Sequence, residues 1–374
     1  MAALVLDKAE ATVACVPLVA ALGDDPSAWE ALRERSPGAS PFASWAWHKA
    51  WAQSAPADEL STSRTVLLRG AGGAVEAILP FALRSTAFRR QHVTALTWAI
   101  GDTGCPDYLD LVAAPEADLD AVIPLLQSLQ WDVLILDNLT PGAANAARLA
   151  SGLARAGCSI RWNLSRRCPY LALPGSWEEY LAALSSNRRQ VLRRRERQLH
   201  RRYDAAVTDY GIDTLDQGWR HLVTLHEQRW AGKGGGAFSD PAVERLQHAF
   251  ARDLALRGQL WLTTLDVAGV PAAAWYGFAE RDTVYFYQSG RDPRWEHESL
   301  GVALMVKMIR RAIERGHRRF DFLRGDEAYK RHWTDSHLVT EELVAFRPGW
   351  RGQWLRGLDW AGRMRARLRP PAPR

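Results

Sequence analysis

Apolar residues recur along the chain at two spacings, and the alternation of these spacings predicts an α/β protein. In the first half, spacings of three and four residues predict helices at 24–36, 44–54, 118–130 and 143–156. Strand-like runs are predicted at 61–70, 74–83, 131–139, 159–164 and 169–174. The first two of these runs flank the turn "GAGG", which indicates a β-hairpin.

The second half has a different order of elements. Ser176, followed by Glu178 and Glu179, suits a helix start, and the pattern continues as one long helix to residue 202. After helices at 214–230 and 240–257, three strand-like runs joined by short turns predict an antiparallel meander at 259–267, 270–280 and 282–290. A helix at 301–315 and a strand at 318–323 follow, and a helical crossover of this kind normally joins parallel strands.

With 374 residues, of which 47% are hydrophobic and 24% charged, the chain is long enough for two compact units. We expect domains at 1–174 and 175–349, followed by a basic tail rich in Trp and Arg at 350–374. No run reaches the roughly 18 apolar residues that span a bilayer, and the N-terminal residues lack the pattern of a signal peptide. The expected location is therefore the cytoplasm.

The four cysteines include no Cys-x-x-Cys pair, and the five-residue spacing of His221 and His226 does not place them on one helix face. Neither a disulfide nor a metal site is expected. The net charge of +6 is concentrated in "NRRQVLRRRERQLHRR" at 187–202. This segment is either a solvated helix face or a phosphate track for tRNA or for a phosphate-linked sugar.

Charge also gathers at the end of a predicted strand, in "FDFLRGDEAYKRHWTD". Alternation places Phe320 and Phe322 on the core side and Asp321 on the other side. Asp326 can then cap a following helix that carries Tyr329. Both carboxylates are equally open to a structural role, as a helix cap and as a buried ion-pair partner.

The order of meander, loop, helix and parallel strand resembles that of GNAT acyltransferases. "ESLGVA" resembles the GNAT pyrophosphate signature in Gly301 and Ala303, and departs from it at Glu298, where the family offers a donor. "RWAGKGGGAFSDP", "YFYQSGRDPRW" and "FDFLRGDEAYKRHWTD" are similar to the second domain of CelD-type acetyltransferases, and "PDYLDLVAAPE" and "WDVLILDNL" to the first. This GNAT branch is related to the FemAB aminoacyl transferases. The resemblance, over 24–347, implies tandem GNAT-like acyltransferase domains with mixed, mostly antiparallel sheets flanked by helices.

The resemblance also implies a residue set for each part of an acyl transfer. Acyl-CoA would lie along the strand before the loop and the helix start, at Tyr287, Gln288, Ser299, Leu300, Gly301, Val302 and Ala303. Tyr329 is expected to protonate the leaving thiolate, with Asp321 and Asp326 as candidate bases for the acceptor amine. The substrate-binding residues would be Glu227, Arg229, Trp230, Arg324 and Lys330. The alternatives are a surface helix before a flexible glycine loop for Glu227 to Trp230, and a tight turn at Gly301.

Three functions remain open from the sequence. The first is an N-acyltransferase that moves an acetyl or other acyl group from acyl-CoA, without a metal, to an amine or amino sugar in exopolysaccharide synthesis. The second is a FemAB-like transferase that uses aminoacyl-tRNA, which the basic helix and Glu298 favour. The third is a non-catalytic GNAT-like module in a polysaccharide assembly. The tail at 350–374 either makes peripheral contact with the inner membrane or packs its tryptophans in the ordinary way.

Overall fold

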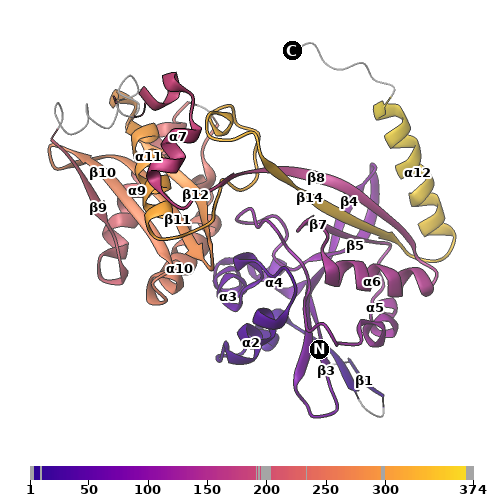
Figure 1. The fold of residues 1–374 in the computed structure, drawn as a ribbon. Coiled ribbons are helices and arrows are strands. Elements are labelled where there is room, and N and C mark those ends of the chain that lie inside the picture. The colour runs from indigo at the N-terminus through magenta and orange to yellow at the C-terminus, as the bar shows by residue number, and fades with distance from the viewer. Residues whose placement is uncertain are drawn as a thin grey trace. The chain divides into compact units, whose positions relative to one another are not determined.

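The computed structural model describes residues 4–8, 11–190, 192, 194, 204–232, 234–295 and 300–367. The chain divides into two compact units, which are drawn in Figure 1. Unit 1 comprises Met1–Arg166 and Val339–Arg374, and unit 2 comprises Arg167–Leu338. This division differs from the expected boundaries at 174 and 349, because the chain leaves unit 1 within one strand and returns to it within another.

Unit 1 is built on a mixed sheet. In order across the sheet, its strands are β1 (Leu4–Lys8), β2 (Ala11–Val16), β3 (Ser63–Arg69), β4 (Val75–Phe88), β5 (Gln91–Trp98), β7 (Val133–Leu139) and β14 (His337–Phe346). The pairs from β1 to β5 are antiparallel, as is the pair of β7 and β14, whereas β5 and β7 are parallel. β6 (Val112–Ala113) pairs with β4. The predicted hairpin is confirmed as β3 and β4.

The four helices predicted in the first half are confirmed. The helical segments of unit 1 are α1 (Leu18–Leu22), α2 (Ser27–Arg35), η1 (Pro41–Ala43), α3 (Trp45–Ser54), α4 (Ala57–Ser61), η2 (Leu119–Val122), α5 (Ile123–Ser128), α6 (Ala144–Arg155) and α12 (Trp350–Arg367). α3 begins where Ser44 Oγ accepts the Trp47 N–H, and it buries Trp47 and Trp51 in the core. Among the described helices, none is both long and apolar enough to cross a membrane.

The strands predicted at 159–164 and 169–174 form one continuous strand, β8 (Ser159–Ala172), so the predicted break between them is wrong. The polar residues between the two runs stay extended because the strand remains paired there. Pro169 O accepts the Phe322 N–H at 2.9 Å, and Arg167 O accepts the Gly325 N–H at 3.1 Å. A proline is tolerated at this position because its carbonyl, not an N–H, makes the bond.

Unit 2 has its own mixed sheet. In order across the sheet, the strands are the end of β8, then β13 (Arg319–Asp321), β12 (Thr283–Arg291), β11 (Val270–Glu280), β10 (Leu260–Val267) and β9 (Ala205–Asp209). The meander β10–β11–β12 is antiparallel, and β13 runs parallel to β12, as the crossover predicted.

Helices cover both faces of the sheet in unit 2 (Figure 1). The helical segments are α7 (Trp177–Ala183), η3 (Ile212–Thr214), α9 (Leu215–Trp230), η4 (Ala237–Ser239), α10 (Pro241–Leu256), η5 (Pro293–Trp295), α11 (Leu300–Glu314) and η6 (Lys330–His332). α7 and α11 share one apolar cluster with the sheet, which includes Trp275 and Phe286. α9 and α10 share another, on the face that carries Tyr276 and Tyr287.

The prediction of one continuous helix from Ser176 to residue 202 is wrong, because the helix is interrupted at residues 184 and 185. α7 starts as predicted, with Ser176 Oγ accepting the Glu179 N–H, but it ends at Ala183 because Leu184 is extended, with φ −77° and ψ 148°. Helical residues resume at 186–190, where Ser185 Oγ and O accept the first N–H groups. The predicted arginines 193, 195, 197, 201 and 202 lie outside the described residues.

Candidate functional site

The defining feature of unit 2 is a pair of parallel strands that separate. β12 and β13 pair at three positions, from Thr283 with Arg319 to Tyr285 with Asp321. β13 then ends, whereas β12 continues to Arg291. A gap therefore opens beside the second half of β12.

The backbone of β12 is directed toward this gap. The Asp292 N–H donates to Ala272 O at 2.9 Å, so the ladder alternation turns the N–H groups of Ser289 and Arg291 away from β11. A β-bulge at Tyr287 lies just before them, because Phe286 pairs with Gly277 and Gln288 with Tyr276. The bulge changes which residues face the gap, and Ser289 becomes a candidate donor to a bound carbonyl.

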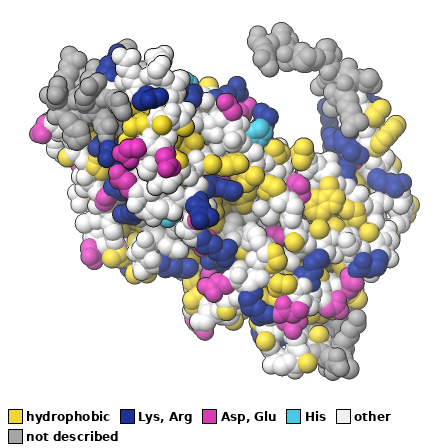
Figure 2. Space-filling view, in the orientation of Figure 1, with side chains coloured by type: hydrophobic (Ala, Val, Ile, Leu, Met, Phe, Trp, Pro, Cys, Tyr) yellow, Lys and Arg dark blue, Asp and Glu magenta, His cyan; other side chains and the backbone are white. Residues whose placement is uncertain are grey.

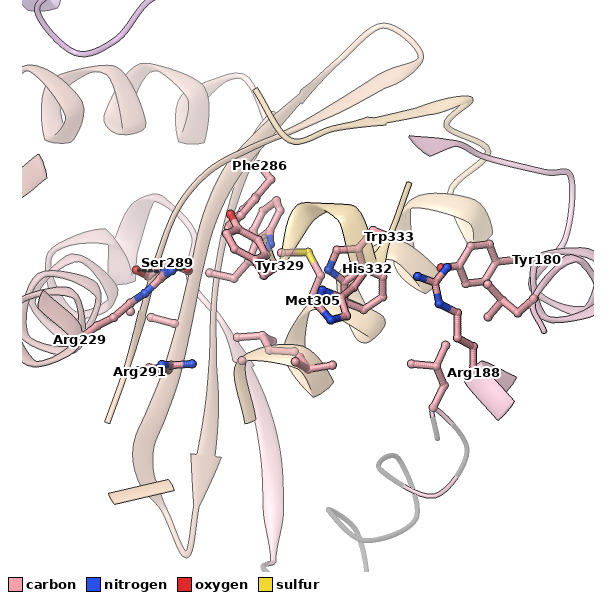
Figure 3. Close-up of a pocket in the computed structure, with 18 of the residues that line it drawn as sticks. Tyr180, Arg188, Arg229, Phe286, Ser289, Arg291, Met305, Tyr329, His332 and Trp333 are labelled. Carbon is pink, nitrogen blue, oxygen red and sulfur yellow. Dashed lines mark hydrogen bonds between the residues drawn. The ribbon is translucent and has the colours of Figure 1, made fainter. Parts of the chain in front are cut away.

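A pocket of about 480 Å³ occupies the gap (Figure 3). Its apolar wall includes Trp275, Phe286, Met305 and Trp333. The polar groups come from five different segments of unit 2 and are Tyr180, Asn187, Arg188, Arg229, Ser289, Arg291, Tyr329 and His332. An apolar cavity with a few converging polar groups is the usual form of a small-molecule site.

The electrostatics of the pocket favour an anionic ligand. Arg188, Arg229 and Arg291 line it, and no carboxylate is among the described residues that do so. Figure 3 shows Arg229 and Arg291 on the β12 side of the pocket and Arg188 on the opposite side, beside Tyr180. Guanidinium groups bind carboxylate and phosphate oxygens with particular strength.

The first turn of α11 forms part of the pocket wall. Gly301 and Val302 line it, whereas Leu300 and Ala303 are buried in the core. A Cβ added at Gly301 would meet no heavy atom within 4 Å. The space beside this backbone is therefore open at a helix N-terminus, where anions are stabilised. The expected contact at Ser299 and the departing residue Glu298 lie outside the described residues.

Tyr329 lies in the pocket, close to Phe286 (Figure 3). Burial raises the pKa of its phenol, Glu327 raises it further, and Arg229 lowers it, with a net upward shift. The phenol is therefore protonated at neutral pH and can donate a proton. The helix expected to carry Tyr329 is the short 3₁₀ helix η6, which begins one residue after Tyr329. Asp326 does not cap it, because its carboxylate pairs with Arg331 at 2.9 Å.

Arg229 reaches the pocket from the last turn of α9. It donates to Ser289 Oγ at 2.6 Å, and its guanidinium lies 5.5 Å from the ring centre of Trp230. Burial lowers the pKa of Arg229, and Tyr329 opposes the shift. Trp230 therefore positions Arg229, whereas the exposed Glu227 on the same helix is not part of the pocket lining.

Most of the charge at the strand end serves the local fold. Lys330 is 2% exposed, and its Nζ donates to the carbonyls of Leu323 at 3.2 Å and Arg324 at 2.7 Å. It also forms an ion pair with Glu327 at 3.0 Å. The buried Asp321 accepts the Leu323 N–H at 2.8 Å, where Leu323 has a φ of +55°. These bonds hold the turn that carries the chain from β13 to Tyr329.

Several expected site residues do not line the pocket. Those whose side chains are described are Asp321, Asp326, Tyr287, Gln288, Leu300, Ala303, Glu227, Trp230, Arg324 and Lys330. Tyr287 faces α10, where its hydroxyl accepts from Gln247 Nε2 at 2.8 Å. The structure brings together Tyr329, Arg229, Gly301 and Val302 from the expected set.

We expect Lys330→Met to lower the free energy of unfolding by about 2–3 kcal/mol, because two buried carbonyls and Glu327 lose a charged donor. Chemical denaturation measures the change. Lys307→Met, on α11 in the same unit, is the control and should change stability by less than about 0.5 kcal/mol. Unchanged stability together with weaker binding of an anionic ligand would show that Lys330 binds substrate instead.

The structure adds pocket residues that the sequence did not point to, among them Tyr180, His332 and Trp333, and it brings Arg188 of the predicted basic segment to the same pocket. His332 is exposed, and its Nδ1 lies 3.1 Å from Ala328 O. If Nδ1 carries the proton toward that carbonyl, Nε2 is an acceptor. His332 and Trp333 belong to the charged segment 320–335 and follow Tyr329 by three and four residues. In a helical turn, this spacing places them on the same side as Tyr329, and it is the sequence signal that could have identified them.

Unit 1 also contains two parallel strands joined by a helical crossover, β5 and β7, but a segment of unit 1 pairs with β7 where β5 ends. β5 and β7 pair at two positions only. Beyond them, the Leu109 N–H donates to Asn138 O and the Thr140 N–H donates to Leu109 O, each at 2.8 Å. Trp98 Nε1 also donates to Asp137 O at 2.9 Å. The segment around Leu109 thus forms a parallel bridge with Leu139 in unit 1, at the position that corresponds to the open gap beside β12 in unit 2.

Residues 186–331 match a family model described as an acetyltransferase (GNAT) domain. No curated protein matches the chain. Among solved structures, FemX is similar with 11% identity and a TM-score of 0.56, over 90% of this chain and 98% of that one. L-PGS from Bacillus licheniformis is similar with 10% identity and a TM-score of 0.52, over 90% of this chain and 96% of that one.

A third similar structure is the C-terminal domain of a putative lysylphosphatidylglycerol synthetase from Agrobacterium fabrum, with 11% identity and a TM-score of 0.53, over 91% and 96% of the two chains. At these identities, the similarity shows the fold. The family match lies within unit 2 and includes α11, Arg229 and Tyr329. Residues 186–331 of unit 2 are therefore similar to a GNAT acetyltransferase domain, and the CelD-type assignment stays a prediction.

Proposed function

We propose that the GNAT-type domain of unit 2 transfers an acyl group from an acyl-CoA to an amine. The observation that carries this proposal is the separation of β12 from β13, with the resulting pocket bounded by the first turn of α11. An extended acyl-pantetheine arm fits beside an open strand edge, and a pyrophosphate fits against the open backbone at Gly301. The three lining arginines suit a ligand with several phosphates.

The residues of the pocket divide the chemistry among them. The Ser289 N–H polarises the thioester carbonyl, which stabilises the oxyanion formed when the amine attacks. Tyr329 gives its proton to the leaving thiolate. His332 takes up the proton of the attacking amine, because it lines the pocket and its Nε2 is an acceptor when Nδ1 donates to Ala328 O. Asp321 and Asp326 are weaker candidates for that base, because their carboxylates bond Leu323 and Arg331.

The acceptor would be a small amine or amino sugar, and the similarity of the quoted motifs to CelD-type acetyltransferases favours exopolysaccharide synthesis as its setting. Arg229, held on Ser289, would bind an anionic group of the acceptor or donor. We place this activity in the cytoplasm, where acyl-CoA is made.

Aminoacyl-tRNA is the second candidate donor. Arg188 is exposed at the pocket wall and begins the arginine-rich segment 187–202, which favours a nucleic-acid phosphate chain over a single nucleotide. Similarity of fold to FemX is compatible with this donor. A GNAT-like module without catalysis is the third possibility, and it would use the pocket for binding alone.

We expect acetyl-CoA to raise the melting temperature of the full chain. A ligand at about 100 times its Kd that binds only the folded state adds roughly 2.7 kcal/mol of stability. Differential scanning calorimetry with acetyl-CoA, with ATP as a matched polyanion and with charged tRNA separates the three functions. Stabilisation by acetyl-CoA but not by ATP supports the first.

Two other outcomes would overturn the acyl-CoA proposal. Salt-dependent binding of charged tRNA without any effect of acetyl-CoA would move the assignment to an aminoacyl transferase. Binding of acetyl-CoA without release of free thiol, across a panel of amines and amino sugars, would leave a binding module.

A further inference from the structure

The helix α12 exposes three large aromatic side chains. Trp350 is 78% exposed, Trp360 is 60% exposed and Trp354 is 45% exposed. Met364, at 39%, continues the same surface. Most tryptophan side chains in folded proteins are largely buried, so three exposed ones on a single 18-residue helix need a reason.

The exposed side chains form one stripe. At about 100° per residue, Trp350, Trp354, Trp360 and Met364 fall within an arc of roughly 120°. The two fully buried side chains of the helix, Leu355 and Asp359, lie on the opposite side. The stripe, defined by these three tryptophans and Met364, therefore faces away from the rest of unit 1.

The buried side of α12 is firmly attached. Leu355 packs into a core cluster with Val93, Val344 and Phe346. Asp359 forms ion pairs with Arg89 at 2.9 Å and Arg161 at 3.1 Å. Because these contacts fix the rotation of the helix, the stripe stays outward, and ordinary packing within the described part of the chain does not account for its tryptophans.

Arginines flank the stripe. Arg356 and Arg365 are exposed, and helical rotation places Arg356 on one side of the stripe and Arg365 on the other. Arg351 is also exposed but forms an ion pair with Asp132 at 2.6 Å. Figure 2 shows hydrophobic and basic side chains together over α12, at the upper right. From residue 350 to the last residue the sequence has seven arginines and a single acid, Asp359, which is buried and paired.

We propose that α12 docks unit 1 on an anionic lipid bilayer. The helix would lie in the plane of the interface, with Trp350, Trp354 and Trp360 at the level of the headgroups and with Arg356 and Arg365 on lipid phosphates. Tryptophan is enriched at membrane–water interfaces because its ring is apolar and its N–H is polar. The charge complementarity and the absence of any exposed acid on the described helix favour an anionic lipid surface over a protein partner.

Vesicle flotation of the full chain tests this docking, with vesicles of phosphatidylcholine alone or mixed with phosphatidylglycerol. Binding should require phosphatidylglycerol and should weaken as salt is added. The triple variant Trp350→Ser, Trp354→Ser, Trp360→Ser should lose at least about tenfold in partitioning. Arg356→Gln with Arg365→Gln should reduce both the binding and its salt dependence.

Leu164→Ser is the matched control, because Leu164 is an exposed apolar side chain, 75% accessible, on β8 instead of α12. It should bind vesicles as the unchanged chain does, and all variants should keep the melting temperature. Absent binding to anionic vesicles, or full binding by the tryptophan variant, would overturn the proposal. So would self-association without vesicle binding that disappears in the tryptophan variant, because the stripe would then be an interface between two copies.

Discussion

Tyr329→Phe is expected to lower kcat for acyl transfer by about two orders of magnitude or more, which is the usual contribution of a general acid. The substitution removes one hydroxyl from the pocket and keeps the aromatic ring that lies near Phe286. The thiolate must then leave without a proton, so the step that breaks the thioester slows. Binding of acetyl-CoA should change little, because the ring contacts remain.

The measurement is release of free thiol from acetyl-CoA in the presence of an amine acceptor, with binding followed separately by calorimetry. The raised pKa of the phenol keeps the donor protonated, so activity should show no loss from phenol ionisation below about pH 10. Tyr180→Phe is the matched control, since Tyr180 lines the same pocket and burial raises its pKa to about 12. Equal activity of Tyr329→Phe and Tyr180→Phe would exclude Tyr329 as the acid.

Gly301→Val is the substitution expected to act most strongly on donor affinity. The Kd for acetyl-CoA should rise by at least about tenfold, which corresponds to about 1.4 kcal/mol. The branched side chain would occupy the open space beside the first turn of α11, where the pyrophosphate is proposed to approach the backbone. Because a Cβ at Gly301 meets no heavy atom within 4 Å, the melting temperature without ligand should change little.

Gly357→Val provides the control for this experiment. Gly357 is a glycine of α12 that also has no heavy atom within 4 Å of an added Cβ, so it reports the cost of a β-branched residue in a helix. Calorimetric titration next to a ligand-free melt distinguishes the roles. A lower ligand-free melting temperature with an unchanged Kd would assign Gly301 to the fold and remove the pyrophosphate site.

The arrangement of the pocket walls was predictable because it depends on local patterns. The alternation of apolar residues in β12, the helical face of α11 and the crossover rule together predict parallel strands around a helix. The return of β14 to unit 1 was not predictable in this way. Its partner β7 lies roughly 200 residues earlier, and local periodicity carries no information about pairing over that distance.

The chemical roles were harder to predict than the fold. Lys330 follows Tyr329 directly and Asp321 belongs to the same quoted segment, yet both side chains bond backbone groups of the same turn. The sequence does not distinguish a lysine or an aspartate that bonds a buried backbone group from one that binds a substrate. Conversely, Arg188 lines the pocket just after the extended residue Leu184 interrupts the helix, and no motif marked that break.

The insertion of unit 2 between β8 and β14 also sets an order for folding during synthesis. Unit 2 is continuous from Arg167 to Leu338, so all of its strands are available once that stretch has emerged from the ribosome. Unit 1 cannot pair β7 with β14 until residue 346 has been made. Until then one edge of β7 has no antiparallel partner, and the buried face of α12 does not yet exist. The first unit to begin synthesis is therefore the last to be completed, and its nascent sheet is the part of the chain that most needs protection from aggregation.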